Sequence, residues 1–165
     1  MENNLKIFVG IFIALAASRF IPHPPNFTSL IALSFYVPAL LGIKFIPALI
    51  ISFAITDMFI GFHNSTFFTW GSVLLIGLLS KYFGGGVKKR VVGALLGATI
   101  FYIITNFGVW SLGMYGYTLQ GLIKSYILAI PFFAFSFLST FIFSCVIEIL
   151  YSIRSLKILV KDIKK

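Results

Sequence analysis

Long apolar segments fill most of the sequence, and they restrict the fold more than any other feature. Six of them occur, and each approaches the roughly 20 residues that an α-helix needs to cross the hydrocarbon core of a bilayer. Hydrophobic residues make up 59% of the chain and charged residues only 10%, which is too little charge for the surface of a water-soluble domain. The sequence therefore predicts an all-α integral membrane protein, a bundle of six transmembrane helices in a single domain over residues 1–165. The predicted spans are approximately 5–21, 27–43, 45–62, 67–83, 91–109 and 127–151.

Lysine and arginine are distributed unevenly between the two ends of the predicted helices. With six spans both termini share a side, and of the 13 Lys and Arg residues only Arg19 and Lys124 fall on the other side. Because basic residues concentrate in cytoplasmic loops, we expect both termini to be cytoplasmic. This asymmetry accounts for the net charge of +9 without a nucleic-acid partner. Residues 153–165 alternate apolar and basic positions at helical spacing, which predicts a basic amphipathic helix on the cytoplasmic surface of the lipid bilayer.

The first apolar segment shares one feature with secretory signal peptides, because Ala14–Leu15–Ala16 follows Lys6 and an apolar stretch. A single lysine is a weak positive region, and the segment continues through Arg19 toward further spans. We interpret it as the first span of the bundle.

Two ionisable residues lie near the outer ends of predicted spans, Arg19 in the first and Asp57 in the third. An isolated charge in or near the hydrocarbon core costs several kcal/mol unless it is paired or hydrated. Their depths match, so we expect the two side chains to approach each other or to contact a polar ligand together. A salt bridge that only joins two helices is an equally good interpretation, and both can hold at once.

Other polar and aromatic residues gather at the same predicted outer ends, among them His23, Asn26, Asn106, Trp110 and Tyr115. An amide for hydrogen bonds beside flat aromatic faces suits a small heterocycle. Aromatic residues at a membrane boundary also act as interfacial anchors, so both roles stay open. The connection 108–126 contains four glycines and is expected to form a mobile lid over the outer side.

No motif predicts catalysis or metal binding. His23 and His63 lack further His or Cys at ligand spacing, and no Ser or Thr lies in a nucleophile motif. We therefore expect no enzymatic activity, no cofactor and no metal ion. An intramembrane enzyme that uses Asp57 and a histidine is the least favoured interpretation, because Asp57 and His63 would lie on different faces of a continuous helix.

Small residues recur at intervals of four in the first span, at Gly10, Ala14 and Ser18. A ridge of small residues lets another helix approach closely, either within the bundle or from a partner subunit.

Several local motifs resemble a family of small bacterial membrane proteins grouped with the substrate-binding S components of energy-coupling-factor (ECF) transporters. The resemblance covers nearly the whole chain. The motifs that carry it are Arg19-Phe-Ile-Pro-His-Pro-Pro-Asn-Phe27, Thr56-Asp57, Thr105-Asn-Phe-Gly-Val-Trp110, Gly113-Met-Tyr115, Gly121-Leu122 and Ile130-Pro-Phe-Phe133.

This resemblance implies a substrate-binding subunit in the cytoplasmic (inner) membrane of a bacterium. It would capture a vitamin-like or heterocyclic micronutrient from outside, and a separate scaffold transmembrane subunit and ATPase pair would drive uptake. The family's Ala-x-x-x-Ala docking motif would fall on Ala14 and Ser18 or on Gly10 and Ala14, and the departure from that pattern puts the docking surface in doubt. The residues expected to bind substrate are Arg19, His23, Asn26, Asp57, Asn106, Trp110 and Tyr115. A non-enzymatic membrane scaffold or assembly protein is the alternative.

Overall fold

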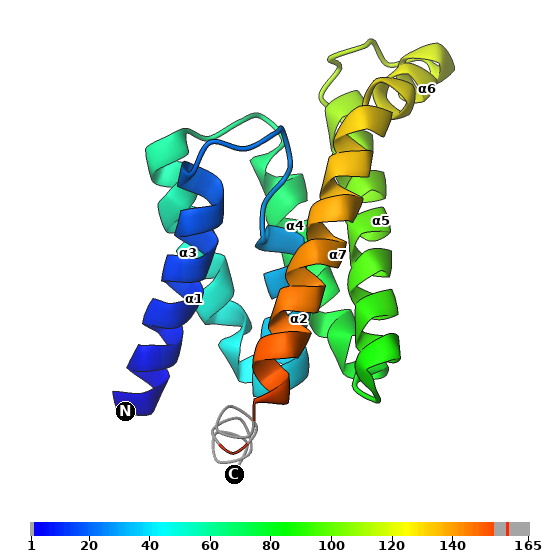
Figure 1. Ribbon diagram of the computed structural model, residues 1–165. Coiled ribbons are helices and arrows are strands. Elements are labelled where there is room, and N and C mark those ends of the chain that lie inside the picture. Colours follow the sequence, from blue (N-terminus) through cyan, green and yellow to red (C-terminus); the bar gives the residue numbers. More distant parts are fainter. Residues whose placement is uncertain (1, 154–157, 159–165) are drawn as a thin grey trace.

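A computed structural model describes residues 2–153 and residue 158. Over this part of the chain the fold consists of seven α-helices and two short 3-10 helices, with no strand (Figure 1). Six of the α-helices fall within or overlap the six predicted spans. In chain order the elements are α1 (Glu2–Phe20), α2 (Leu30–Leu41), η1 (Ile43–Phe45), α3 (Ile46–Ile60), α4 (Thr66–Leu79), η2 (Ser80–Phe83), α5 (Val87–Ser111), α6 (Leu119–Leu128) and α7 (Ile130–Ser152).

Four helical segments are long and apolar enough to cross a membrane. They are Ile43–Ile60, Thr66–Phe83, Val87–Ser111 and Ile130–Ser152. Large apolar side chains also cover the outer surface of the bundle, with Phe67 84% exposed and Ile149 66% exposed at distant points of it. Apolar surface on this scale is typical of contact with lipid rather than with water. The protein is therefore membrane-associated.

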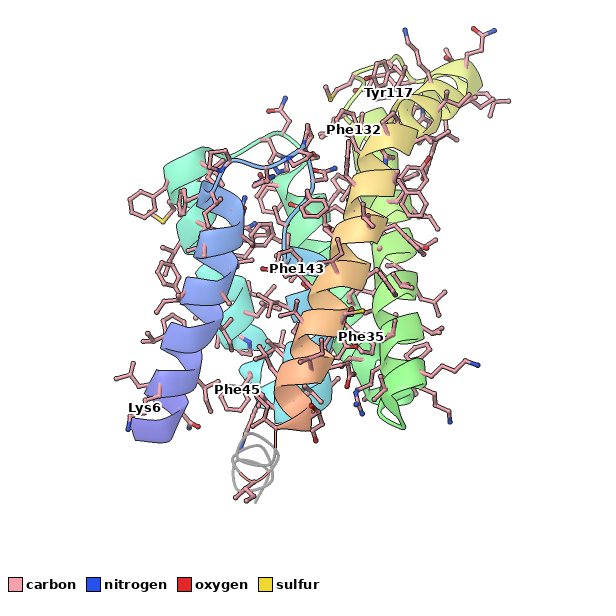
Figure 2. All side chains as sticks on the ribbon, in the orientation of Figure 1. Lys6, Phe35, Phe45, Tyr117, Phe132 and Phe143 are labelled. Carbon is pink, nitrogen blue, oxygen red and sulfur yellow. The ribbon has the colours of Figure 1, made fainter. Side chains whose placement is uncertain are left out.

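The connections between helices alternate between the two ends of the molecule (Figure 1). The start of α1, the η1 turn, the η2 turn and the end of α7 lie at one end, and the α1–α2, α3–α4 and α5–α6 connections lie at the other. Lys6 lies at the first of these ends, whereas Tyr117 and Phe132 lie at the second (Figure 2). The first end also carries Lys44 in η1 and Lys81 in η2, so these lysines lie at the same end as Lys6, as the sequence predicts.

Helix α2 is shorter than the predicted span 27–43, and it lies inside the bundle. Its 12 residues extend only about 18 Å. Nine of them are buried against α4, α5, α7 and their neighbours, as expected for a helix that is apolar on all sides. The shortening has a local cause: Asn26 has a positive φ of 61°, and the Ser29 hydroxyl donates to the Ala14 carbonyl of α1. The turn at Asn26 and the hydrogen bond of Ser29 to α1 hold residues 21–29 as a non-helical strap across the end of the bundle.

The prediction of one long flexible connection over 108–126 is wrong. Helix α5 continues to Ser111 and α6 begins at Leu119, so only seven residues, 112–118, connect the two helices. The Thr118 hydroxyl accepts a hydrogen bond from the Gly121 amide and caps the N-terminus of α6. This cap favours a helix in a stretch whose glycines suggested a flexible connection. Most of the predicted basic helix over 153–165 lies outside the described residues.

A candidate ligand-binding cavity

A cavity opens at the end of the bundle where the α1–α2 and α3–α4 connections lie, beside the N-terminus of α2. It consists of two adjoining chambers with volumes of about 230 and 210 Å³. Side chains from α1, α2, α3, α4, α5 and α7 line it. The two chambers share a common wall formed by Asn26, His63, Thr69, Phe101 and Ser136. Their combined volume fits a small molecule.

The first chamber, here the Arg19 chamber, is the one that an arginine lines. Arg19, His23 and Thr28 line it together with Leu30 and Ile31, which begin α2. The His23 Nδ1 atom lies 2.7 Å from the Pro24 carbonyl oxygen, so the ring is oriented by its own turn.

The second chamber, here the Asn106 chamber, combines an amide with aromatic walls. The Asn106 Nδ2 atom donates to the Tyr102 carbonyl over 2.8 Å, which leaves the Oδ1 atom of the amide as an acceptor for a ligand. The Tyr102 and Phe133 rings lie 4.7 Å apart, and Phe132 lies at this end of the molecule (Figure 2). A flat apolar group with one hydrogen-bond donor would complement these walls.

Arg19 and Asp57 form a buried ion pair, as one of the two sequence-based interpretations expected. The Arg19 Nη2 atom lies 2.6 Å from Asp57 Oδ1, and the Asp57 side chain is 1% exposed. Trp70 Nε1 donates to Asp57 Oδ2 over 2.8 Å. Arg19 also donates to the Thr56 hydroxyl and stacks 4.6 Å from the Phe53 ring centroid. Asp57 therefore lies behind Arg19, and only Arg19 of the two lines the cavity.

Trp110 and Tyr115 lie outside the two chambers. Trp110 Nε1 donates to the Thr118 carbonyl over 3.1 Å, and its ring packs 5.4 Å from Phe107, so this side chain connects α5 to the start of α6. Tyr115 lines a separate space of about 200 Å³ that adjoins Asn106. The structure thus brings Arg19, His23, Asn26 and Asn106 together around one cavity and places Asp57, Trp110 and Tyr115 around its margin.

Helix α6 is attached to α5 by two tyrosines. The Tyr102 hydroxyl donates to the Tyr126 carbonyl over 2.7 Å, and the Tyr126 hydroxyl donates to the Ile103 carbonyl over 2.8 Å. Burial raises the pKa of the Tyr126 hydroxyl, so this group stays a hydrogen-bond donor at neutral pH. These bonds fix the outer edge of the Asn106 chamber.

Sequence reasoning missed three polar residues of the shared wall. Ser136 and Thr69 lie in apolar segments, where a hydroxyl is easily taken for a helix-packing residue. From the sequence, His63 is weighed as a metal ligand and as a catalytic histidine, and it is not among the expected substrate-binding residues. No group of three or more His, Cys, Asp or Glu side chains within the described residues could hold a metal ion.

A second buried ion pair, Arg90–Glu148, lies near the opposite end of the molecule. Arg90 Nε and Nη2 donate to the two Glu148 carboxylate oxygens over 2.7 and 2.6 Å, a bidentate arrangement that joins α5 to α7. Arg90 belongs to the basic residues that the sequence places at the end of the two termini, and its side chain is buried in this ion pair. A lone glutamate in the apolar segment 127–151 was the signal for such a pair.

The small-residue ridge of α1 is partly uncovered. Gly10 and Ala14 are exposed, and a Cβ atom built on Gly10 would meet nothing within 4 Å. Ser18, in contrast, faces the interior, where its hydroxyl lies 2.7 Å from the Ser29 hydroxyl. The ridge therefore divides into an exposed part near Gly10 and Ala14 and an internal contact at Ser18.

Comparison with family models gives one result that covers nearly the whole chain: the model described as "Family of unknown function (DUF6580)" matches residues 1–159. The chain belongs to the DUF6580 family. Comparisons of this DUF6580 protein with curated proteins and with solved structures give no significant match.

Proposed function

We propose that this DUF6580 protein is the substrate-binding membrane subunit of an ECF-type importer. It captures a small vitamin-like or heterocyclic micronutrient from outside a bacterial cell. Its chain passes six times between the two faces of the inner membrane, the second time through the short helix α2 inside the bundle, and both termini lie in the cytoplasm. Separate scaffold and ATPase subunits drive uptake. The observation that carries this proposal is the two-chamber cavity, which opens at the end of the molecule that is poor in lysine and offers hydrogen-bonding groups beside aromatic walls.

The exposed part of the α1 ridge supports the proposal that a scaffold subunit binds this protein. Gly10 and Ala14 leave the α1 backbone open to close approach by a helix of the scaffold subunit. Ser18 is engaged with Ser29, so the docking residues in this chain are Gly10 and Ala14.

Ligand capture is tested with purified protein in detergent, by mass spectrometry of co-purifying small molecules and by thermal-shift screening of micronutrients. A bound ligand stabilises the folded state by mass action, about 2.7 kcal/mol at 100 times its Kd. Asn106→Ala removes the free acceptor of the Asn106 chamber and should abolish the shift. Asn64→Ala, an exposed amide of the α3–α4 connection outside the cavity lining, is the matched control and should keep it.

The alternative is a non-enzymatic membrane scaffold. Its support is the position of Asp57 behind Arg19, which is typical of a residue that fixes helix packing. The same screen separates the two functions. If no micronutrient stabilises the protein and none co-purifies, the carrier proposal fails and the scaffold is favoured.

A further inference from the structure

A groove lies on the surface of the bundle between α4 and α5, and its lining residues differ from those of the cavity. Its volume is about 290 Å³. The residues that form its floor are buried: Phe35, Ile76, Gly93 and Gly97. Its edge is open, because Leu96 is exposed. The Thr99 hydroxyl also lines the groove but donates to the Leu95 carbonyl of the same helix, so a ligand meets an almost wholly apolar surface. We refer to it as the α4–α5 groove.

The α4–α5 groove is confined to one half of the bundle, at the lysine-rich end. Along α5 its lining extends from Gly93 to Ile100, a distance of about 10 Å. The hydrocarbon core of a bilayer is about 30 Å thick, so a groove of this length lies within one leaflet. Phe83 of η2 also lines it, and η2 lies at the end of the molecule that carries both termini (Figure 1). An acyl chain from the leaflet at that end matches this apolar groove in chemistry and in depth.

Lysines lie where the groove meets the lysine-rich end. Lys81 belongs to η2, and Lys88 and Lys89 belong to the first turn of α5. Lys89 is four residues before Gly93, so both lie on the same face of α5. The Lys89 side chain folds over the turn between η2 and α5, since a Cβ atom built on Gly85 would lie 3.6 Å from its Nζ atom. Lys88 and Lys89 are exposed, and neither forms an ion pair within the described part of the chain. Two positive charges therefore face any anionic group at the end of the groove.

A second apolar depression, on α7, lacks this charge. It has a volume of about 420 Å³ and is lined by α7 residues from Ile130 to Phe141. Helix α7 contains no lysine or arginine over Ile130–Ser152. An acyl chain of any lipid can cover such a surface, and nothing there selects a headgroup. The α4–α5 groove differs because an apolar channel and a pair of lysines are combined at one end of the same helix.

We propose that the α4–α5 groove binds an anionic phospholipid from the leaflet at the lysine-rich end of the protein. One acyl chain lies in the groove, and the headgroup phosphate lies beside Lys88 and Lys89. This inference goes beyond the proposed transport function and does not depend on it, because it requires only that the protein lies in a bilayer. Helix α1 packs against α2 and α3 on another side of the bundle, so a scaffold subunit on α1 and a lipid in the groove can be bound together (Figure 1).

Native mass spectrometry of the detergent-purified protein tests the headgroup. The protein is titrated with phosphatidylglycerol, which is anionic, and with phosphatidylethanolamine of the same acyl chains, whose ammonium group offsets its phosphate. We expect one phosphatidylglycerol molecule to bind in preference. The double variant Lys88→Gln with Lys89→Gln should lower the affinity for phosphatidylglycerol about 30-fold, which corresponds to about 2 kcal/mol. Lys6→Gln with Lys44→Gln is the matched control, because it removes the same charge at the same end but outside the groove.

A second pair of variants tests the acyl chain. Leu96→Trp narrows the groove and should weaken the binding of phosphatidylglycerol. Leu74→Trp should not, because Leu74 on α4 is exposed to nearly the same extent, 43% against 44%, and does not line the groove.

The proposal is overturned if the unchanged protein binds both phospholipids equally, a comparison that needs no variant to fold. Equal losses in the two lysine double variants would show that only the general charge of this end attracts the lipid, which also overturns the site. Unchanged binding by Leu96→Trp would remove the acyl chain from the groove. None of these results bears on the cavity, whose ligand is tested separately by the micronutrient screen.

Discussion

The Arg19 guanidinium group already interacts with other side chains of the protein in the absence of a ligand. Asp57, Thr56 and the Phe53 ring all contact its guanidinium group, and Trp70 holds the second oxygen of the Asp57 carboxylate. In a low-dielectric interior such a pair is retained because removal of one partner leaves a buried charge uncompensated. The ion pair therefore positions the rim of the Arg19 chamber, and a ligand meets a guanidinium group whose charge is already balanced.

Asp57→Ala should lower the free energy of unfolding by about 3–5 kcal/mol, because it leaves Arg19 without a counter-ion. The double variant Arg19→Met with Asp57→Ala removes both charges and should recover much of this loss. Thermal unfolding of the three proteins in the same detergent measures the effect. Equal stability of the single variant and the unchanged protein would show that the pair contributes nothing to the fold.

At the scale of elements, α5 packs closely against several neighbouring helices. Its buried face consists of small residues, Gly93, Ala94, Gly97 and Ala98, and it contacts α2, α4 and α7. A Cβ atom at Gly93 would lie 2.6 Å from Phe35 Cε2, and one at Gly97 would lie 3.0 Å from Ile76 Cγ2. Small residues at such positions let helix backbones approach closely, which maximises van der Waals contact in a lipid environment.

Gly93→Ala should therefore destabilise the protein by about 1–3 kcal/mol, because the added methyl group has no space beside Phe35 and Phe83. Gly10→Ala on α1 provides the matched control, since its Cβ meets nothing within 4 Å and alanine favours helix formation. Thermal unfolding compares the two variants. A Gly93→Ala protein as stable as Gly10→Ala would contradict the close packing of α5.

Hydropathy alone predicts a helix in each of the six apolar segments, because apolar length is what a bilayer requires. It does not predict the true length of α2, since an apolar composition is shared by a full span and by a short helix buried among others. The Arg19–Asp57 contact follows from two charges at matching depth, whereas Ser136 is overlooked because one hydroxyl in an apolar segment carries no distinguishing pattern. Glu148 could have been found, because an acidic residue inside an apolar helix demands a partner.

For the whole molecule, the decisive asymmetry is that between its two ends. The η1 and η2 turns and the start of α5 carry lysines, and the cavity opens at the opposite end. Basic residues are retained on the cytoplasmic side during membrane insertion. The fold and the charges together therefore orient the cavity toward the outside in the proposed topology.

Site-directed labelling checks this orientation. In a Cys145→Ala background, Asn64→Cys in the α3–α4 connection should react with an impermeant maleimide added to intact bacterial cells. Lys88→Cys at the start of α5 should react only after the cells are permeabilised. Both positions are exposed, so accessibility to the reagent depends on the side of the membrane alone. The reverse labelling pattern would invert the cavity and remove the case for uptake from outside.

The shortness of α2 also constrains how the chain is built during translation. A helix of 12 residues extends about 18 Å and does not cross a hydrocarbon core about 30 Å thick by itself. The helices that surround it, α4, α5 and α7, leave the ribosome later than α2 does. Until α4, α5 and α7 have been synthesised, nascent α2 must therefore be stabilised by contacts with α1, with α3 or with the insertion machinery.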